Sequence, residues 1–190
     1  MKIELDLKEG KCGDYELKQF TVSAKEAEFH LLRCIINGRA SRALLPGTYW
    51  RLIHKGEIIM TNTPAEVTDH IPFIMKANGN VLIAGLGLGM VIHELLKKPD
   101  VKRITVVEIS NDVINLVSNS YKDPRLEIVN ADIFTYEPSN KYDYGWYDIW
   151  NYISEDNYPE MVALIKRLSS YVMIQDCWCM QECKSLAMQV

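Results

Sequence analysis

The sequence predicts an α/β protein built on a doubly wound, mostly parallel sheet, and two observations lead to this fold. Residues 80–110 read as an apolar run, a glycine turn, a helical segment and a second apolar run. Apolar runs and amphipathic segments then go on alternating, as is typical of parallel strands joined by crossover helices. The expected strands are 81–84, 104–109, 125–131, 141–150 and 171–175, and the expected helices between them are 90–98, 111–118 and 159–169.

The glycine turn is the first indication of a ligand site. Gly85, Gly87 and Gly89 follow the first apolar run and precede the helical segment. Glycines let the backbone turn sharply and approach a ligand, and the start of a helix offers free N–H groups. Glu108 lies near the end of the second strand, where a carboxylate can accept hydrogen bonds from a ribose diol. We therefore expect an adenosine-containing cofactor, and the alternative is a tight turn that binds nothing.

The spacing of these glycines resembles that of a known family. Met90 stands where a dinucleotide-binding fingerprint has its third glycine, so the motif is GxGxG, as in class I S-adenosylmethionine-dependent methyltransferases. Ile83 is apolar, as in the spermidine synthase-like branch, the polyamine aminopropyltransferases. The resemblance implies a Rossmann-like sheet of the methyltransferase type and S-adenosylmethionine as the cofactor. The residues that it implies for cofactor binding near the turn are Gly85, Gly87, Gly89, Glu108 and Ile109.

Further site residues are implied by the same resemblance. Asp132 follows the third strand, where an acid lies beside the adenine amine in the resembled families, and Asp148 matches an aspartate that helps to accept the proton of an attacking amine. His70 matches a histidine or glutamine and is expected to contact the cofactor. For the aspartates the alternative is a cap on the next turn or helix, and for His70 it is a helix surface. Trp150 and Asn151 are expected to shape the acceptor pocket.

The chain also departs from the spermidine synthase-like pattern. Tyr142, Asp143 and Gln175 match that pattern, but Leu88 replaces an aspartate that holds the amino group of decarboxylated S-adenosylmethionine. The last two strands of a methyltransferase sheet are missing after residues 171–175, so the sheet is expected to be truncated at its C-terminal side. Because a bare sheet edge promotes aggregation, we expect the N-terminal strands or a second copy of the chain to cover it.

We expect two domains, which are an N-terminal, β-rich extension of residues 1–78 and a Rossmann-like cofactor-binding domain of residues 79–190. Ser23 and Glu26 match a capping box, which indicates that a helix begins there. The extension is expected to hold strands at 2–7 and 15–22, a helix ending near 37, a hairpin at 47–61 and a helix at 66–76.

The composition limits the class of partner. A net charge of −4 over 190 residues gives no general attraction to nucleic acid. No apolar run reaches the roughly 18 residues of a membrane helix, and the first residues hold no apolar signal core, so a cytoplasmic protein is expected. The five cysteines are expected to be free thiols. Cys177, Cys179 and Cys183 lack the paired spacing of a zinc site, so no metal is expected.

Three functions remain open from the sequence. The first is an S-adenosylmethionine-dependent methyltransferase with an unknown acceptor. The second is a spermidine synthase-like aminopropyltransferase, which Asp148 supports and Leu88 disfavours. The third is a protein that binds S-adenosylmethionine without catalysing a transfer.

Overall fold

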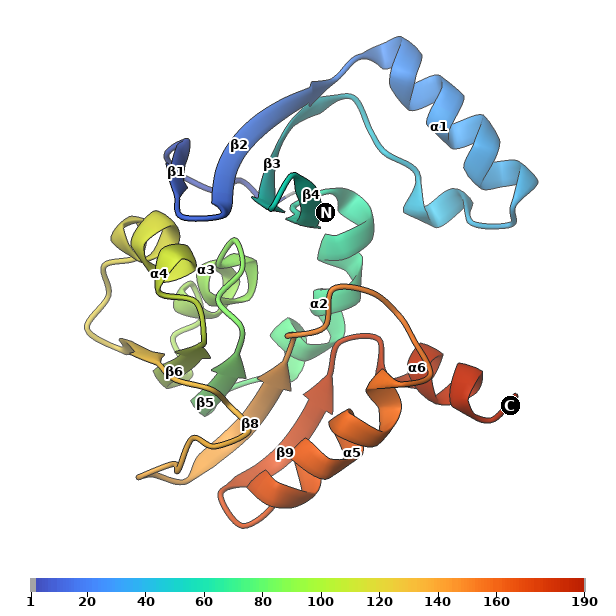
Figure 1. The fold of residues 1–190 in the computed structure, drawn as a ribbon. Coiled ribbons are helices and arrows are strands. Elements are labelled where there is room, and N and C mark those ends of the chain that lie inside the picture. The colour runs from blue at the N-terminus through green and yellow to red at the C-terminus, as the bar shows by residue number, and fades with distance from the viewer. Residues whose placement is uncertain (1–2, 190) are drawn as a thin grey trace.

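The structure, a computed structural model, describes residues 3–189 and contains two sheets (Figure 1). The larger sheet is wholly parallel, in the order β7-β6-β5-β8-β9. Its strands are β5 (Gly79–Ala84), β6 (Val101–Glu108), β7 (Leu126–Asn130), β8 (Tyr142–Tyr147) and β9 (Val172–Cys177). The chain runs outward from β5 to β7 and then crosses back to β8, which confirms the predicted doubly wound parallel sheet.

Helices cover both faces of this sheet. One face packs against α2 (Pro64–Lys76), α3 (Met90–Leu96) and α4 (Asn111–Val117), and the other against α5 (Asn157–Leu168). Successive side chains of a strand point to opposite faces. Accordingly Ile83 of β5 joins the buried cluster of the first face, and Leu82 joins that of the second. A short 3₁₀ turn (Ser118–Ser120) follows α4, and α6 (Met180–Ala187) follows β9.

The smaller sheet is antiparallel and is formed by the N-terminal part of the chain. Its strands are β1 (Gly10–Cys12), β2 (Tyr15–Val22), β3 (Gly47–His54) and β4 (Glu57–Thr61), paired in that order. Lys55 and Gly56 join β3 to β4 with positive φ angles of 51° and 89°, which are the angles of a tight hairpin turn. The predicted hairpin is thereby confirmed.

The strand expected over residues 2–7 is wrong for residues 3–7, and residue 2 lies outside the described residues. The carbonyl of Ile3 accepts a hydrogen bond from the Asn62 amide, and the carbonyl of Leu5 accepts one from the Trp50 indole. Ile3 is buried. Two carbonyls of this segment are therefore bonded to side chains of β3 and of the residue after β4, and the segment does not join the sheet as a strand.

The smaller sheet packs on the larger one. Trp50 and Leu52 of β3 belong to the same buried cluster as Ile83 of β5 and Leu88 of the glycine turn. This contact closes the space above the ends of the parallel strands. The division into two domains after residue 78 stays a prediction.

Helix α1 (Ala24–Ile36) connects β2 to a 3₁₀ turn (Ala40–Arg42) and stands away from the larger sheet (Figure 1). Ser23 and Glu26 form the predicted capping box. The helix leaves several large apolar side chains exposed, which are Phe29, Leu32, Ile35 and Ile36.

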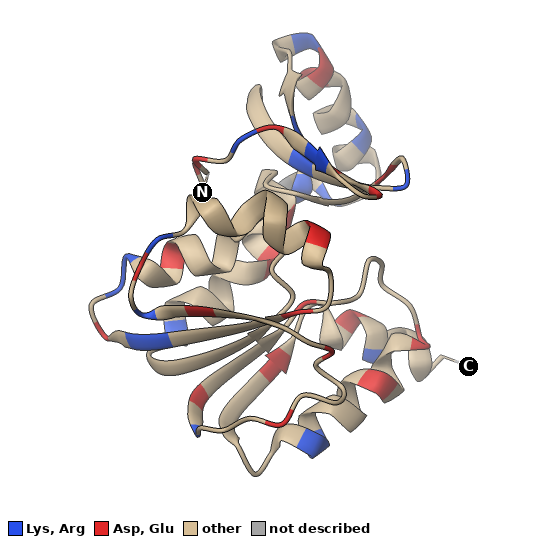
Figure 2. Ribbon diagram, turned by 60° about the vertical axis from the view of Figure 1, so that its left-hand side comes forward, with Lys and Arg blue, Asp and Glu red and all other residues tan. Residues whose placement is uncertain are grey.

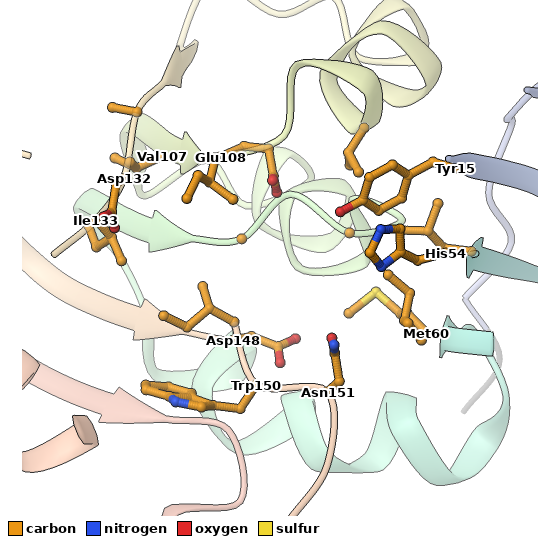
Figure 3. Close-up of a pocket in the computed structure, with 18 of the residues that line it drawn as sticks. Tyr15, His54, Met60, Val107, Glu108, Asp132, Ile133, Asp148, Trp150 and Asn151 are labelled. Atoms are coloured by element: carbon orange, nitrogen blue, oxygen red, sulfur yellow. The ribbon is translucent and has the colours of Figure 1, made fainter. Parts of the chain in front are cut away.

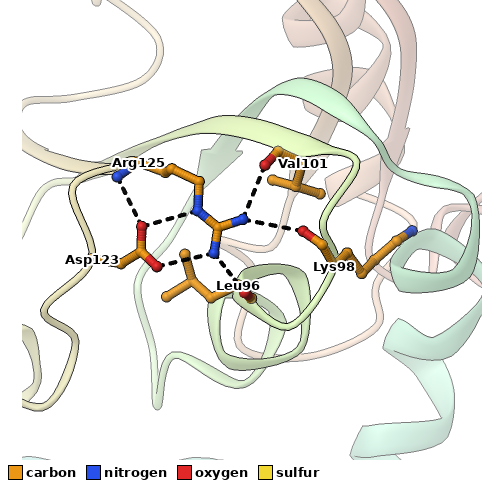
Figure 4. Close-up of polar contacts among 5 residues, drawn as sticks. All are labelled: Leu96, Lys98, Val101, Asp123 and Arg125. Carbon is orange, nitrogen blue, oxygen red and sulfur yellow. Dashed lines mark hydrogen bonds and ion pairs between the residues drawn. The ribbon is translucent and has the colours of Figure 1, made fainter.

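A charged cluster fixes the amino end of the parallel sheet (Figure 4). The guanidinium of Arg125 donates hydrogen bonds to the carbonyls of Leu96, Lys98 and Val101, over 2.6, 3.1 and 3.0 Å. Its Nη2 also lies 2.9 Å from Oδ2 of Asp123. The last carbonyls of a helix have no partner within the helix. Arg125 therefore ties the end of α3 to the start of β6.

Strand β9 lies at an edge of the parallel sheet. The expectation that N-terminal strands cover this edge is wrong, because they form a sheet of their own. Met173 and Ile174 of β9 are exposed.

Basic and acidic residues are interspersed over the ribbon (Figure 2). Within residues 3–189, no helix has the length and apolar character needed to span a bilayer.

Candidate functional site

A cavity of about 420 Å³ lies at the carboxyl end of the parallel sheet (Figure 3). In an open α/β sheet this end is where ligands bind. The cavity walls include eight of the ten predicted site residues, which are Gly85, Gly87, Glu108, Ile109, Asp132, Asp148, Trp150 and Asn151. Gly89 and His70 are not on its walls, and both line a small void of about 20 Å³ beside it.

Glu108 holds the glycine turn in place. Its Oε2 accepts a hydrogen bond from the Leu86 N–H and its Oε1 accepts one from the Ser110 N–H, both over 2.8 Å. Each carboxylate oxygen has two lone pairs, so the side chain keeps acceptor capacity for a ligand hydroxyl. Glu108 is 8 % exposed and lines the cavity, which fits the predicted contact with a ribose.

Asp132 lies on the cavity wall beyond β7, together with Ile133 (Figure 3). Its Oδ1 accepts a hydrogen bond from the Phe134 N–H over 2.9 Å, so Asp132 also caps the turn that follows, as the structural alternative had it. One carboxylate oxygen makes this bond and the other remains available. The capping role and the predicted contact with an adenine are therefore compatible.

The three glycines of the turn meet different neighbours. A Cβ at Gly85 would lie 2.2 Å from the carbonyl oxygen of Asp148, and a Cβ at Gly87 would lie 2.4 Å from Sδ of Met60. A Cβ at Gly89 would meet the ring of Tyr121 at 2.4 Å, and all three glycines have positive φ. All three glycines thus make room for protein atoms, and Gly89, which packs against Tyr121, is not on the cavity wall.

Among the carboxylic acids of residues 3–189, Asp148 has the largest shift in pKa. It follows β8, and its side chain is 13 % exposed. Burial, together with the nearby carboxylates of Glu66 and Asp69, raises the pKa of Asp148 to about 7. Near neutral pH this carboxyl can therefore both hold and release a proton.

His70 lies behind Asp148 on α2. Its Nε2 is 3.7 Å from Oδ2 of Asp148, which is longer than a hydrogen bond. His70 is 2 % exposed, and burial lowers its pKa to about 4, so it is neutral at pH 7. This position does not support direct contact with a ligand in the cavity, but it makes His70 part of the environment of Asp148.

Two further acids on α2 have protein partners. Glu66 accepts hydrogen bonds from the N–H and the hydroxyl of Thr61, both over 2.7 Å, and burial raises its pKa. Asp69 forms a two-point ion pair with Arg42, with N–O distances of 2.6 and 2.9 Å. Thr61 and Arg42 precede α2 in the chain, so these bonds fix α2, and with it His70, against the N-terminal part.

Trp150 and Asn151 lie on the loop after Asp148, below the cavity (Figure 3). The Trp150 indole donates a hydrogen bond to Glu160 of α5 over 3.0 Å, which fixes the loop to that helix. Both residues line the cavity, and their role in an acceptor pocket stays a prediction.

Other residues that match the spermidine synthase-like pattern lie elsewhere. Asp143 is at the amino end of β8, where its Oδ2 accepts a hydrogen bond from the Asn80 N–H over 2.7 Å. Gln175 packs toward α5, accepting from the Tyr147 hydroxyl and donating to the Ile165 carbonyl. Both have structural partners, and neither is on the cavity wall.

Sequence reasoning missed the wall that the smaller sheet contributes. This wall consists of Tyr15, Leu52, His54, Ile59 and Met60. Tyr15 and His54 pair across β2 and β3, and their rings stack with centroids 4.4 Å apart. The hairpin pattern predicts such pairs, but nothing local indicates which surface they face.

No cluster of His, Cys, Asp and Glu within residues 3–189 has the arrangement of a metal site. The five cysteines have free thiols.

The strand order, the glycine turn after β5 and the acids at the carboxyl ends of β6 and β8 define a Rossmann-like fold of the methyltransferase type. The family model of the spermine/spermidine synthase domain matches residues 63–170. The chain therefore belongs to the spermine/spermidine synthase domain family.

Individual relatives match in part. The polyamine aminopropyltransferase of Bacillus mycoides is 38% identical over 88 residues, covering 41% of this chain and 32% of that protein. That of Clostridium tetani is 28% identical over 156 residues, covering 74% and 54%. This chain thus matches between about a third and about half of the length of these relatives.

Solved structures show a weak overall likeness. The spermidine synthase from Thermotoga maritima gives a TM-score of 0.44 at 18% identity, covering 80% of this chain and 50% of that one. A structure titled "DhpI-SAM-HEP complex" gives 0.46 at 18% identity, covering 57% and 49%.

Proposed function

We propose that the chain binds an S-adenosyl sulfonium compound in the cavity and transfers an alkyl group from it to an amine beside Asp148. The observation that carries this proposal is that Glu108, Asp132 and Asp148, at the carboxyl ends of β6, β7 and β8, line one cavity next to the glycine turn. A cavity of about 420 Å³ is within the range of small-molecule sites.

In this proposal the nucleoside binds between Glu108 and Asp132. Glu108 accepts hydrogen bonds from the ribose hydroxyls, and the free oxygen of Asp132 accepts one from the adenine amine. Val107 and Ile133 supply apolar contact for the base on the same wall (Figure 3). Gly85 and Gly87 also line the cavity, where Gly85 allows the Asp148 backbone and Gly87 the Met60 side chain to pack closely against the turn.

Asp148 then acts as the proton acceptor. An amine attacks through its lone pair and becomes positively charged, so it must lose a proton to give the neutral product. When bound, the sulfonium supplies the carbon under attack and leaves as a neutral thioether. With a pKa of about 7, the ionised carboxylate is a stronger base than an exposed aspartate and is populated near neutral pH. Orienting the amine in line with the breaking bond supplies most of the remaining rate enhancement.

We propose S-adenosylmethionine as the donor, so that a methyl group is transferred. Leu88 supports this choice because it is fully buried and offers no negative charge to a ligand amine. Aminopropyl transfer from decarboxylated S-adenosylmethionine is the second candidate, and membership of the spermine/spermidine synthase domain family favours it. A protein that binds the donor without catalysis is the third.

Calorimetry with S-adenosylmethionine, its decarboxylated form and S-adenosylhomocysteine tests the proposal. We expect binding of S-adenosylmethionine and S-adenosylhomocysteine, with no preference for the decarboxylated form. A preference of tenfold or more for the decarboxylated form would establish the second candidate. If none of the three binds at millimolar concentration, the proposed function is wrong. Incubation of the bound donor with a panel of amines, followed by chromatography of the nucleoside product, then separates a transferase from a binding protein.

A further inference from the structure

The side chain of Met60 reaches from β4 onto the glycine turn. The Leu88 N–H points at its Sδ over 3.3 Å. A Cβ added at Gly87 would lie 2.4 Å from Sδ and 2.9 Å from Cε of Met60, so the thioether packs directly against the backbone there. Met60 also lines both the cavity and the small void beside it, as do Gly85 and Asp148.

Met60 lies on the side of the cavity opposite Asp132, next to His54 (Figure 3). Glu108 and Asp132 lie at one end, and the sulfur of Met60 points into the space between the glycine turn and Asp148 with Asn151. This inference rests on the proposed function, in which the nucleoside occupies the end with Glu108 and Asp132. A chain attached to its 5′ carbon must then extend past the glycine turn, where the Met60 thioether lies.

The contact that holds Met60 there is weak. A thioether sulfur is a poor acceptor, and methionine has three rotatable bonds that let it move into other spaces. A carboxylate is a much stronger acceptor for a backbone N–H. A ligand with a polar amino-acid chain can thus displace Met60 and take over the Leu88 N–H, whereas a ligand with a short 5′ substituent leaves Met60 in place.

We propose that Met60 is a specificity-determining gate on the amino-acid end of the ligand site. Its bulk closes the space beside Gly87 and Leu88, and ligands with a long 5′ chain bind only after its side chain has rotated away. The gate therefore lowers the affinity for long-chain ligands and leaves the affinity for short-chain nucleosides unchanged.

Calorimetry with two probes tests the gate, namely S-adenosylmethionine, with its amino-acid chain, and 5′-methylthioadenosine, with a methyl group in its place. We expect Met60→Ala to bind S-adenosylmethionine about tenfold more tightly, or about 1.4 kcal/mol, because no side chain must be displaced. Its affinity for 5′-methylthioadenosine should stay within about twofold of wild type. Met60→Leu keeps a similar volume and should resemble wild type with both probes.

The control is Met75→Ala, which makes the same change at an exposed position of α2 and should alter neither affinity. The gate is wrong if Met60→Ala lowers the affinity for S-adenosylmethionine, changes the affinities for both probes by the same factor, or changes neither affinity. It is also wrong if Met60→Leu has the same affinities as Met60→Ala. In each of those cases the probes still bind wild type, so the proposed function stands. If neither probe binds wild type or any variant, the proposed function fails and the gate fails with it.

Discussion

The two ends of the parallel sheet both carry charged side chains, but these side chains have different surroundings. At the amino end, Arg125 is bonded to three carbonyls and to Asp123, and Asp143 accepts from the Asn80 N–H. At the carboxyl end, Asp148 lies near other carboxylates and beside a neutral histidine, and its pKa is raised to about 7. The charged groups of the amino end are bonded to protein partners, whereas the carboxyl of Asp148 lies among other acids that raise its pKa.

Strand β8 makes the difference clear, because an aspartate lies at each of its ends. Asp143 and Asp148 both match the spermidine synthase-like pattern, and they are the same residue type in one short segment. Asp143 has a backbone donor at 2.7 Å, and Asp148 faces the cavity. A match to a motif therefore does not distinguish a structural aspartate from a candidate proton acceptor, but the partners of each carboxylate do.

The largest effect that we expect is on the rate of transfer. Asp148→Asn should lower kcat by about a hundredfold or more, because general base catalysis contributes about 10²–10⁴ to a rate. Asparagine keeps the shape of the side chain but accepts no proton. The rate of formation of the nucleoside product, with a donor and an amine that the wild type turns over, gives this loss.

Asp143→Asn is the matched control, since it is the same change at the other end of the same strand. Its kcat should stay within about twofold of wild type, because the side chain is not on the cavity wall. Equal losses in the two variants, or a larger loss at Asp143, would contradict the assignment of Asp148.

The next effect in size is on stability and concerns the amino end. Arg125→Ala removes the donor of three backbone hydrogen bonds and the partner of Asp123. We expect its midpoint of thermal unfolding to fall by roughly 5 °C, since the carbonyls of α3 and β6 lose their common partner. Arg103→Ala, which breaks only an exposed ion pair with Glu127, should shift the midpoint by roughly 1 °C or less. Similar shifts in both variants would show that the Arg125 cluster does not hold the amino end together.

The elements of the larger sheet could be predicted because their signals are local. The glycine turn, the helical spacing after it and the acid at the end of β6 lie within about 25 residues, and each indicates its own structure. The shared cavity follows from topology, because the carboxyl ends of parallel strands meet at one edge of the sheet. Glu108, Asp132 and Asp148 could therefore be placed together before any coordinates were known.

The wall formed by the smaller sheet could not be predicted in the same way. Alternation shows that Tyr15 and His54 can pair across a hairpin, but no periodicity shows which distant surface the pair faces. Met60 has the same limitation, since its contact with Leu88 joins residues 28 positions apart. Residues 3–7 alternate like a strand but find their backbone partners in the Asn62 and Trp50 side chains.

The third effect that we expect is a pair of opposite pH dependences of stability at the carboxyl end. Asp148, with its pKa raised to about 7, holds a proton in the folded state that the unfolded chain releases near pH 4. Taken alone, Asp148 makes the protein less stable as the pH rises from 4 to 7. His70, with its pKa lowered to about 4, lacks a proton that the unfolded chain binds below about 6.5. Taken alone, His70 makes the protein more stable over the same rise.

In the wild type these two slopes oppose each other between pH 4 and 6.5, because the folded and unfolded states then bind the same number of protons at this pair. His70→Gln should leave the Asp148 slope, so that its stability relative to wild type falls by up to about 1.4 kcal/mol per pH unit as the pH rises. Asp148→Asn should leave the His70 slope, so that its relative stability rises with pH by a similar amount. Urea unfolding of all three proteins at pH 4.5, 5.5 and 6.5 gives these differences, and titrations elsewhere in the chain cancel between variant and wild type. Slopes of the same sign in the two variants would mean that the pKa of Asp148 is not raised in the folded state or that the pKa of His70 is not lowered.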